Sequence, residues 1–494
     1  MKNTKIKAPS LLQSWTPIML LVLMLSLSVH LFGEDSSYGA NQIALILSAC
    51  FAALLGVYNG MKWKQIEAGI VKGISMSLGA LLILLAVGSL IGTWILSGVV
   101  PTMIYYGLEL LSPNWFYVAS CAICALVALS IGSSWTVAGT IGISLMGVGI
   151  GMGLSPEITA GAVISGAYFG DKMSPLSDTT NLAPAVAGTE LFTHIRHMVW
   201  TTTPSLIIAL ILFTFLGLNS AGNANLSAMV NLKNSLHVQF QPNIILLFPL
   251  LLVFGMAMKK IPAFPTIMTG AIVGGLFAVV FQPNHVTHLA GLDGGLGMLK
   301  GVWMALFDGY KADTGLPTLD KLLSRGGMSS MMITVWLILS AMTFGAVMET
   351  TGKLQRIVNA LLSMVHSTGS LILTTIATCI GTNILAADQY IAIVLPGRMY
   401  RAEFARRKLA PENLSRTLED SATLTSPLIP WNTCGAYMAV TLGVATLSYA
   451  PYAFFNWINP IVAVIYGFMN IKITPMEEEI PVNLELAENS NLTS

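Results

Sequence analysis

The chain has 494 residues, of which 54% are hydrophobic and only 10% are charged. A soluble protein carries about 25% charged residues, so the composition excludes a soluble enzyme, a disordered protein and a nucleic-acid-binding protein. The 24 basic and 23 acidic residues almost cancel, so no overall charge would attract nucleic acid. The sequence predicts a polytopic membrane protein. Its five cysteines all lie in apolar runs, which is typical of small buried residues and not of a metal site.

Apolar windows long enough to cross a bilayer follow one another along the chain, since a transmembrane helix needs about 20 apolar residues. They cover residues 16–33, 40–60, 78–98, 114–131, 135–153, 200–218, 243–258, 263–282, 328–348, 368–397 and 448–469. Two further segments, 158–190 and 419–446, are apolar but interrupted by Gly, Pro and charged residues. The sequence therefore predicts an all-α polytopic membrane protein with about 11–13 membrane segments, counting the broken ones.

Basic residues indicate which ends of these segments face the cytoplasm, because Lys and Arg are enriched in cytoplasmic loops. Lysines precede the first window and follow the second, whereas the loop between these windows has Glu34 and Asp35 and no basic residue. The N-terminus is therefore predicted to be cytoplasmic. Five basic residues predict another cytoplasmic loop at 398–408, and 219–242 is expected outside. The segment 283–327 is expected to be a long loop.

Two parts of the chain resemble each other weakly and in the same order. I-G-S-S-W-T-V-A-G-T from Ile131 matches I-G-T-N-I-L-A-A-D-Q from Ile380, and S-P-L recurs at Ser174 and Ser426. S-P-E at residue 155 similarly matches A-P-E at residue 410, and charge places these two sites on opposite sides of the membrane. The sequence therefore predicts inverted repeats, which are typical of secondary transporters with broken helices at the substrate site. The alternative is that segments rich in Gly and Pro align by composition alone.

This repeat divides the chain into five regions. They are the N-terminal spans with an amphipathic linker (1–75), the first repeat (76–219), spans with a long connecting loop (220–327), the second repeat (328–470) and an acidic tail (471–494).

The segment 170–181 stands out because its polar side chains lie in an otherwise apolar region. Pro175 breaks a helix that enters it, and unwound backbone at membrane depth must be buried in protein or line a cavity. Backbone, carboxylate and hydroxyl oxygens together suit a small alkali cation. The ion-binding residues predicted here are Asp171, Ser174, Ser177, Asp178, Thr179, Thr180 and Asn181. Two alternatives stay open: an interfacial ion pair of Asp171 with Lys172, and a helix cap by Asp178.

A second polar segment, 419–433, combines acidic, hydroxyl and proline residues in the same way, and Asp388 precedes it in a stretch without other charges. The ion-binding residues predicted in this half are Thr382, Asn383, Asp388, Asp420, Thr425, Asn432 and Thr433. The alternative for Asp388 and Asp420 is that they hold a hairpin together by hydrogen bonds. Glu419 is expected nearer the cytoplasmic end, solvated or paired with Arg416.

Other polar residues are less directly indicated. Ser133, Ser134 and Thr136 match the second half by repeat position alone. His194 and His197 are expected at a cytoplasmic helix end, where a pH-sensing role is an open alternative. Intramembrane ionisable residues are functional-site candidates by default, so the aspartates carry the prediction.

These residues predict exchange of two ions that compete for one set of carboxylates. A desolvated carboxyl group holds a proton when no cation is bound, and a dehydrated Na+ with several oxygen ligands displaces that proton. The predicted Na+ ligands are Asp178, Thr179, Asn181 and Asp388, and Asp171 is the predicted proton carrier. One moving site then couples Na+ and H+ fluxes without a cofactor, an ATP-binding motif or enzymatic chemistry.

Two other functions stay open. Exchange of malate against lactate needs an anion site, for which Lys172 and the amides of Asn181, Asn383 and Asn432 are available. An ion channel needs a continuous pore and not two crossed broken hairpins.

The run G-A-Y-F-G-D-K-M-S-P-L-S-D-T-T-N-L-A-P at 166–184 closely resembles the characteristic segment of NhaC-type Na+/H+ antiporters. The stretches 381–390 and 420–433 are similar to the second-half motifs of that family, and the resemblance covers about 40–470. It implies a bacterial inner-membrane protein with the fold of the wider ion-transporter superfamily. That fold has a scaffold domain and a transport domain of inverted repeats with hairpins that moves as an elevator.

The resemblance also bears on partners. Elevator transporters favour dimers because a fixed scaffold must anchor the moving part, so a homodimer in contact with membrane lipid is expected by analogy. The same family contains malate/lactate antiporters that exchange Na+ and H+ with small organic acids. The motifs do not separate these two activities.

Overall fold

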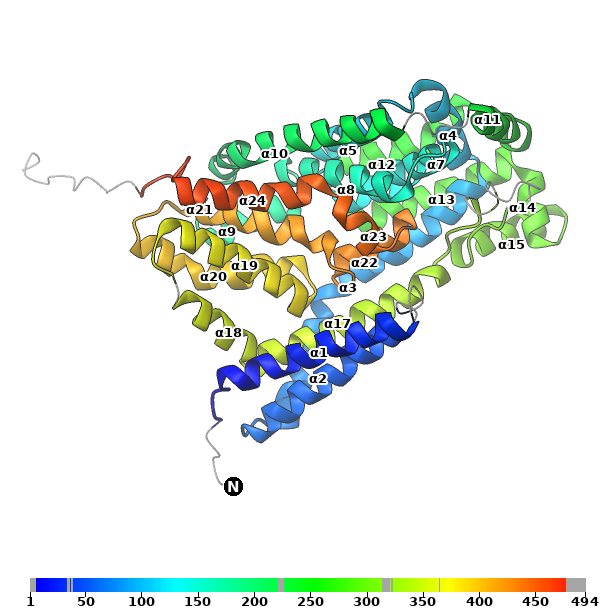
Figure 1. The fold of residues 1–494 in the computed structure, drawn as a ribbon. Coiled ribbons are helices and arrows are strands. Elements are labelled where there is room, and N and C mark those ends of the chain that lie inside the picture. Colours follow the sequence, from blue (N-terminus) through cyan, green and yellow to red (C-terminus); the bar gives the residue numbers. More distant parts are fainter. Residues whose placement is uncertain are drawn as a thin grey trace, which may run out of the picture.

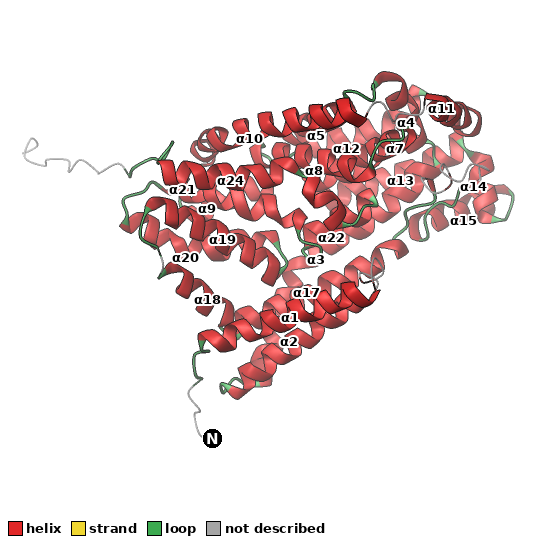
Figure 2. Ribbon diagram, in the orientation of Figure 1, coloured by secondary structure: helices red, strands yellow, loops and turns green. Residues whose placement is uncertain are grey.

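A computed structural model describes residues 6–32, 36, 39–220, 226–312, 320, 323–363 and 365–476. Apart from one isolated β-bridge between Leu409 and Pro475, every regular element in these ranges is helical (Figures 1 and 2), which confirms the all-α prediction. Most of the predicted acidic tail lies outside the described residues.

The helices follow one another in chain order with short connections. The first part contains α1 (Leu11–Phe32), α2 (Ala40–Tyr58), α3 (Trp63–Leu96), α4 (Val99–Leu110), α5 (Phe116–Ile131), α6 (Ser134–Val137), a π-helical turn η2 (Ala138–Gly142), α7 (Ile143–Gly151), α8 (Pro156–Met173), α9 (Asp178–Ala187) and α10 (Leu191–Ser220). The middle contains α11 (Leu226–Phe240), the 3-10 turn η4 (Ile244–Leu247), α12 (Phe248–Met258), α13 (Ala263–Phe281), α14 (Pro283–Ala290) and α15 (Gly294–Phe307).

The last part contains the 3-10 turn η5 (Ser329–Met331), α17 (Met332–Thr350), α18 (Lys353–Leu362), α19 (Thr368–Ala386), α20 (Gln389–Arg406), α21 (Pro411–Leu418), a π-helical turn η6 (Glu419–Thr423), the 3-10 turn η7 (Ser426–Leu428), α22 (Thr433–Leu442), α23 (Thr446–Tyr449), the 3-10 turn η8 (Ala450–Tyr452) and α24 (Phe454–Met469).

Eight of the described helical segments are long and apolar enough to cross a membrane, or up to ten if two bent pairs each count as one span. The bent pairs are 229–240 with 244–258, at 89°, and 446–452 with 454–469, at 58°. The chain is therefore a multi-pass membrane protein. The expected 11–13 segments exceed this count because α5 has only 16 residues and the polar segments 158–190 and 419–446 are divided into shorter helices.

The expectation of a long loop at 283–327 was wrong for its first part, which forms α14 and α15. Gly301 allows α15 to pack closely against α14, because a Cβ added there would lie 2.3 Å from the Val286 carbonyl oxygen of α14. Helix–helix contact through small residues is common in membrane proteins. Such contact stabilises helices in this segment, whose mixed charge had predicted a loop. The segment 219–242, expected only as an outer connection, likewise contains α11.

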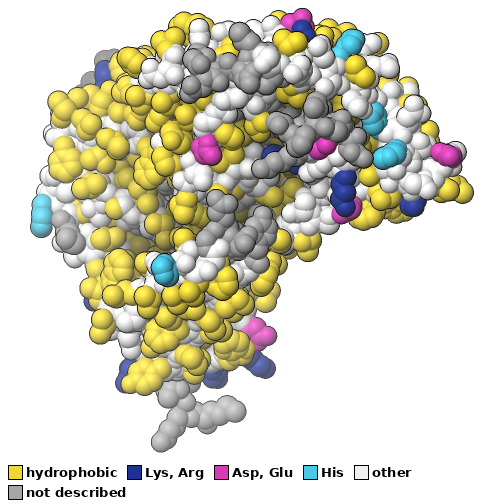
Figure 3. All heavy atoms as spheres, turned by 45° about the vertical axis from the view of Figure 1, so that its right-hand side comes forward, with side chains coloured by type: hydrophobic (Ala, Val, Ile, Leu, Met, Phe, Trp, Pro, Cys, Tyr) yellow, Lys and Arg dark blue, Asp and Glu magenta, His cyan; other side chains and the backbone are white. Residues whose placement is uncertain are grey.

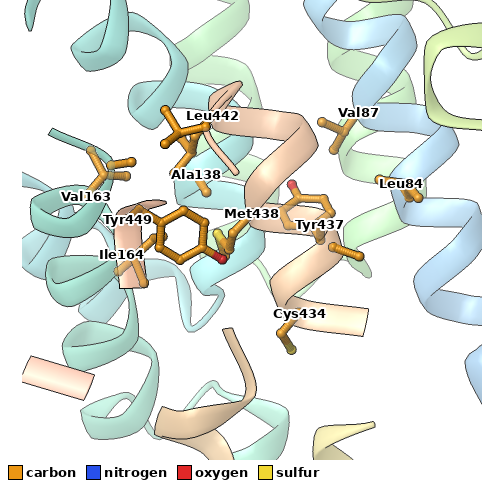
Figure 4. Close-up of a cluster of buried hydrophobic side chains, with 14 of the residues drawn as sticks. Leu84, Val87, Ala138, Val163, Ile164, Cys434, Tyr437, Met438, Leu442 and Tyr449 are labelled. Carbon is orange, nitrogen blue, oxygen red and sulfur yellow. The ribbon is translucent and has the colours of Figure 1, made fainter. Parts of the chain in front are cut away.

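Figure 1 shows α1, α2 and α17 side by side, and the long α3 packs against α13, α15 and α17. On the other side, α5, α8, α10 and α24 pack together. Helices α20 and α21 pack against α9, and α19 packs against α20, α21 and α24. Helices α9 and α18 to α21 form most of a second, smaller hydrophobic core, to which η6 and α24 contribute Ala422 and Ala463. In Figure 4, Tyr437 and Leu442 of α22 lie within the larger core, between Val87 of α3 and Val163 of α8.

Large hydrophobic side chains cover much of the outer surface. In the view of Figure 3 they dominate the face, and charged side chains are few. On α1 alone, Leu12, Met19, Leu23 and Leu31 each expose more than half of their side-chain surface. A soluble monomer rarely exposes contiguous apolar patches of this kind, so this surface fits contact with lipid.

Helix breaks occur in the same order in both halves. α5 ends at Gly132 (φ 75°) and α19 at Ala387 (φ 56°), both in the left-handed conformation, and a new helix starts directly after each. Helices that begin with Pro156 and Pro411 then lead into the two S-P-L breaks. This order supports the predicted repeat. The sequence match paired Ile131 with Ile380, but the second break follows residue 386 and not residue 380. The matched motifs therefore do not stand at equivalent positions relative to the two breaks.

Candidate functional site

The centre of the candidate site is a buried ion pair between Lys172 in the last turn of α8 and Asp420 in η6. Neither side chain is exposed, and the Lys172 ammonium contacts Asp420 Oδ1. The same oxygen accepts hydrogen bonds from Thr201 Oγ1 of α10 (3.1 Å) and Asn459 Nδ2 of α24 (2.7 Å). Four elements therefore meet at one carboxylate. Lys172 pairs with Asp420 and not with Asp171, so the alternative of an Asp171–Lys172 ion pair was wrong.

Three carboxylate oxygens at this centre lack hydrogen-bond partners among the described residues. They are Asp420 Oδ2 and both oxygens of Glu419, which is fully buried. Lys172, Thr423, Asp171 and Thr179 are polar residues in the surroundings of Glu419. An uncompensated charged group in the interior costs several kcal/mol. These oxygens therefore form a place where a proton or a cation would be held.

The expectation that Glu419 is solvated or paired with Arg416 was wrong. Arg416 is itself buried and donates from Nη1 to the Lys472 carbonyl oxygen (2.9 Å). The Glu419 carboxylate instead lies near Lys172. Asp420 was among the predicted ion-binding residues, whereas Glu419 was not. The adjacent acidic pair at 419–420 in a region with few charges is the sequence signal that could have indicated Glu419 as well.

Asp171 lies close by but is held by the first helix break. Its Oδ2 accepts hydrogen bonds from the Ser134 backbone N–H (3.0 Å) and hydroxyl (2.6 Å) at the start of α6, where a negative charge is favourable. Ser133 is the N-cap residue of α6 and accepts from Thr136 N–H (3.2 Å). Of the three hydroxyl residues singled out by repeat position, Ser134 contacts Asp171, whereas Ser133 and Thr136 are hydrogen-bonded to each other.

The two breaks of the first half contact each other. A Cβ added to Gly132 would lie 2.7 Å from the Leu176 carbonyl carbon, so only glycine fits there. Thr180 of α9 donates to the carbonyl oxygens of Asp171 (3.1 Å) and Lys172 (2.9 Å) and closes the turn. The ion pair of Lys172 with Asp420 therefore lies at the end of α8, whose last backbone carbonyl groups are held by these hydrogen bonds.

The remaining predicted residues of segment 170–181 either form hydrogen bonds within the segment or have exposed side chains. Ser174 Oγ accepts from Leu176 N–H (3.3 Å), and the hydroxyls of Ser177 and Thr179 are 3.1 Å apart. The Asn181 side chain is exposed and donates to the Pro175 and Ser177 carbonyl oxygens (3.0 and 2.7 Å). Asp178 begins α9 with an exposed side chain.

The second-half residues surround the break between α19 and α20. Asn383 donates to Thr425 Oγ1 (3.1 Å) and to the Ala422 carbonyl oxygen (2.6 Å), and Asn432 donates to Asn383 Oδ1 (3.1 Å). Thr433 N–H donates to the Ala387 carbonyl oxygen (2.9 Å). Thr382, by contrast, donates within its own helix to the Thr378 carbonyl oxygen (2.8 Å).

Asp388 is the N-cap of α20. Its Oδ1 accepts hydrogen bonds from the backbone N–H groups of Tyr390 (2.9 Å) and Ile391 (3.1 Å). The side chain is 2% exposed, and Oδ2 takes part in neither bond. Asp171 and Asp178 also lie near Tyr390. Three carboxylates therefore approach this tyrosine, although the described residues include no group of three His, Cys, Asp or Glu placed to hold a metal ion.

Comparisons with known proteins bear on this arrangement. The family described as the Na+/H+ antiporter family matches residues 166–471, a range that contains both polar segments. The chain is 38% identical over 434 residues to the Na+/H+ antiporter NhaC of Alkalihalophilus pseudofirmus, covering 87% of this chain and 90% of that protein. It is 38% identical over 428 residues to the malate-2H+/Na+-lactate antiporter of Bacillus subtilis, covering 86% and 89%. The arginine/ornithine antiporter ArcD of Halobacterium salinarum is 35% identical over 477 residues, covering 96% and 95%.

Proposed function

The chain belongs to the Na+/H+ antiporter family, and we propose that it is a secondary active transporter that exchanges Na+ for H+ across a bacterial inner membrane. The observation that carries this proposal is the buried cluster of Lys172, Glu419 and Asp420. With both acids ionised, two negative charges and one positive charge leave the cluster with a net charge of −1. One monovalent cation neutralises it, and that cation is either a proton or Na+.

Competition between the two ions follows from the available oxygens. Both carboxylate oxygens of Glu419 and Asp420 Oδ2 have no hydrogen-bond partner within the described part of the chain. The same holds for two further buried oxygens, Thr423 Oγ1 of η6 and Asn459 Oδ1 of α24. A dehydrated Na+ needs several such ligands, whereas a proton needs only one carboxylate. Binding of one ion therefore removes the site of the other, and a gradient of either drives the opposite movement of its competitor.

We also propose the ligand set Asp178, Thr179, Asn181 and Asp388 for Na+. Thr179 lies near Glu419 and so connects this set to the buried cluster. The exposed Asp178 would contact the Na+ before this ion loses its hydration shell. Asp171, hydrogen-bonded to Ser134, is the proposed proton carrier of this outer part.

Alternating access would move this site between the two sides. The similar order of breaks in the two halves supports inverted repeats, and the smaller core of α9 and α18 to α21 supports a separately moving part. We propose an elevator motion of that part, a homodimer that anchors the remainder, and a cytoplasmic N-terminus. Substrate sites of such transporters lie where helices are broken near the midplane.

Asp178→Asn is expected to keep the fold and to abolish Na+-dependent proton movement. The side chain is exposed and makes no hydrogen bond or ion pair within the described ranges, so the amide changes no native contact. It removes the charge that would attract the cation. Proton movement in proteoliposomes after a Na+ pulse measures the effect. Asp293→Asn, an exposed aspartate before α15, is the matched control, and near-normal exchange by well-folded Asp178→Asn would contradict the role of Asp178.

Asp388→Ser is expected to raise the apparent KM for Na+ while the stability changes little. Serine retains a capping oxygen for α20, whereas a helix that loses its cap is destabilised by about 1 kcal/mol. The second carboxylate oxygen, which the cap does not use, is lost. Ser367→Ala removes the corresponding cap of α19 and controls for the loss of stability alone. An unchanged KM in Asp388→Ser would assign this residue to the cap only.

Coupled exchange of small organic acids is the second candidate function. It is favoured by the 38% identity to the malate-2H+/Na+-lactate antiporter, as high as the identity to NhaC. Lys172, considered as an anion site, is fully buried and already paired with Asp420. That pairing leaves the amides as anion-binding groups and favours the exchange of Na+ and H+ alone.

One assay separates these functions. Proteoliposomes with an imposed pH gradient receive NaCl, then KCl, then Na+ with malate or lactate, and a dye reports the internal pH. A response to NaCl alone supports Na+/H+ exchange. A response that requires an organic acid supports the second candidate, and silence throughout contradicts both.

A further inference from the structure

A surface pocket lies at the end of α10 that faces α21. It has a volume of about 210 Å³, is open to the outside, and is lined by Thr193, Arg196, His197, Trp200 and Glu412. The Lys472 ammonium lies 3.9 Å from the centre of the Trp200 ring at its edge. The pocket is therefore polar and charged in a molecule whose surface is otherwise mostly apolar.

Polar side chains lead inward from this pocket along one face of α10. His194, His197 and Thr201 follow a spacing of three and four residues, which places them on the same side of a helix. His197 lines the pocket and is 9% exposed, whereas the other two are fully buried. Thr201 donates to Asp420 Oδ1 (3.1 Å). This face of α10 therefore extends from the pocket to the buried ion pair.

A second connection runs through α21. His194 Nδ1 lies 2.8 Å from Ser415 Oγ, and Ser415 precedes Glu419 by four residues, about one helical turn. The polar face of α10 thus ends at Asp420, and the turn of α21 that contains Ser415 leads toward Glu419. These two acids carry the carboxylate oxygens that have no partner among the described residues.

The two imidazoles are themselves incompletely bonded. The Nε2 atoms of His194 and His197 are buried and have no hydrogen-bond partner among the residues that the structure describes. Lys172 of α8 and the neighbouring His197 face His194. Arg416 and Asn413 of α21 face His197. Burial, together with the positive charges of Lys172 and Arg416, disfavours a lasting positive charge on either ring, so a proton that arrives is passed on and not stored.

We propose that this pocket is the entrance through which protons reach Glu419 and Asp420, and that His197 and His194 relay them. A neutral imidazole accepts a proton on its free ring nitrogen and releases the proton from the other nitrogen, so each step leaves the ring neutral. Ser415 and Thr201 receive and pass on the proton in the same way. The proposal rests on the proposed ion exchange and names its proton route.

His194→Gln and His197→Gln test the relay, because glutamine can hydrogen bond but cannot carry a proton at neutral pH. At saturating NaCl the rate of proton movement is expected to fall at least about 100-fold, with the apparent KM for Na+ unchanged, since a positioned proton carrier contributes at least this much. His288→Gln, an exposed histidine of α14, is the matched control. Added imidazole is expected to restore part of the rate in His197→Ala, because the open pocket admits it. Wild-type rates in both glutamine variants would overturn the relay.

Chemical blocking of the pocket provides a second test, which does not depend on whether the histidine variants fold. Thr193 is exposed in the pocket, and Cys50 is the exposed native cysteine. In a Cys50→Ser background, Thr193→Cys labelled with a bulky membrane-impermeant thiol reagent is expected to lose proton movement, whereas the Cys50→Ser protein alone is unaffected. Full activity after complete labelling would overturn the entrance. Silence of the wild type would instead contradict the proposed function itself.

Discussion

Lys172→Met alone is expected to destabilise the protein by about 3–5 kcal/mol, because it leaves Asp420 ionised and buried without its partner. Asp420→Leu alone strands the ammonium at a similar cost. The double variant Lys172→Met, Asp420→Leu removes both charges and is expected to recover most of that stability. All three variants are expected to lose ion exchange, since the carboxylate or the charge balance is absent. Unfolding in detergent and proteoliposome assays provide the two readouts.

The two readouts separate the structural role of the pair from its role in transport. Lys259→Met, an exposed lysine after α12, is the matched control and is expected to change neither. Recovery of stability without recovery of exchange in the double variant assigns Lys172 and Asp420 to the ion site. Exchange at the wild-type rate in the double variant would contradict that assignment.

Glu419→Gln is expected to fold normally and to reduce Na+-driven proton movement at least about 100-fold, the lower range for loss of a proton-carrying group. The amide has nearly the same volume, and the Glu419 carboxylate makes no hydrogen bond to any residue that the structure describes, so the substitution breaks none there. With one negative charge removed, the cluster is neutral without a bound cation, so neither ion is required. Binding of radioactive Na+ to the purified protein measures the same change without transport.

Glu349→Gln, an exposed glutamate at the end of α17, is the matched control for this substitution. Normal Na+ binding and proton movement by folded Glu419→Gln would show that this buried acid is not part of the ion site. Asp420 would then have to hold the exchanged ion alone.

Much of the fold could be predicted because it depends on local properties of the chain. Apolar windows predicted helices such as α2 and α13 closely, since a lipid-facing helix must be apolar along its length. Pro175 predicted the end of α8, because proline removes a backbone donor. Windows failed for α14 and α15, which have 8 and 14 residues and are too short to fill an apolar window of about 20 residues. Their contact through Gly301 is a tertiary feature that no window detects.

The sequence by itself determined that this is a helical membrane protein, that a helix ends before Pro175, and that the polar segments 170–181 and 419–433 carry charge into an apolar interior. Only the tertiary structure decided which charges meet. Lys172 and Asp420 are 248 residues apart in sequence, so no local pattern could pair them. Glu419 is buried because η6 packs among α9, α10 and α24, and Asp171 faces Ser134 because two breaks lie side by side. Burial and pairing depend on what surrounds a side chain, which residue type and spacing alone do not specify.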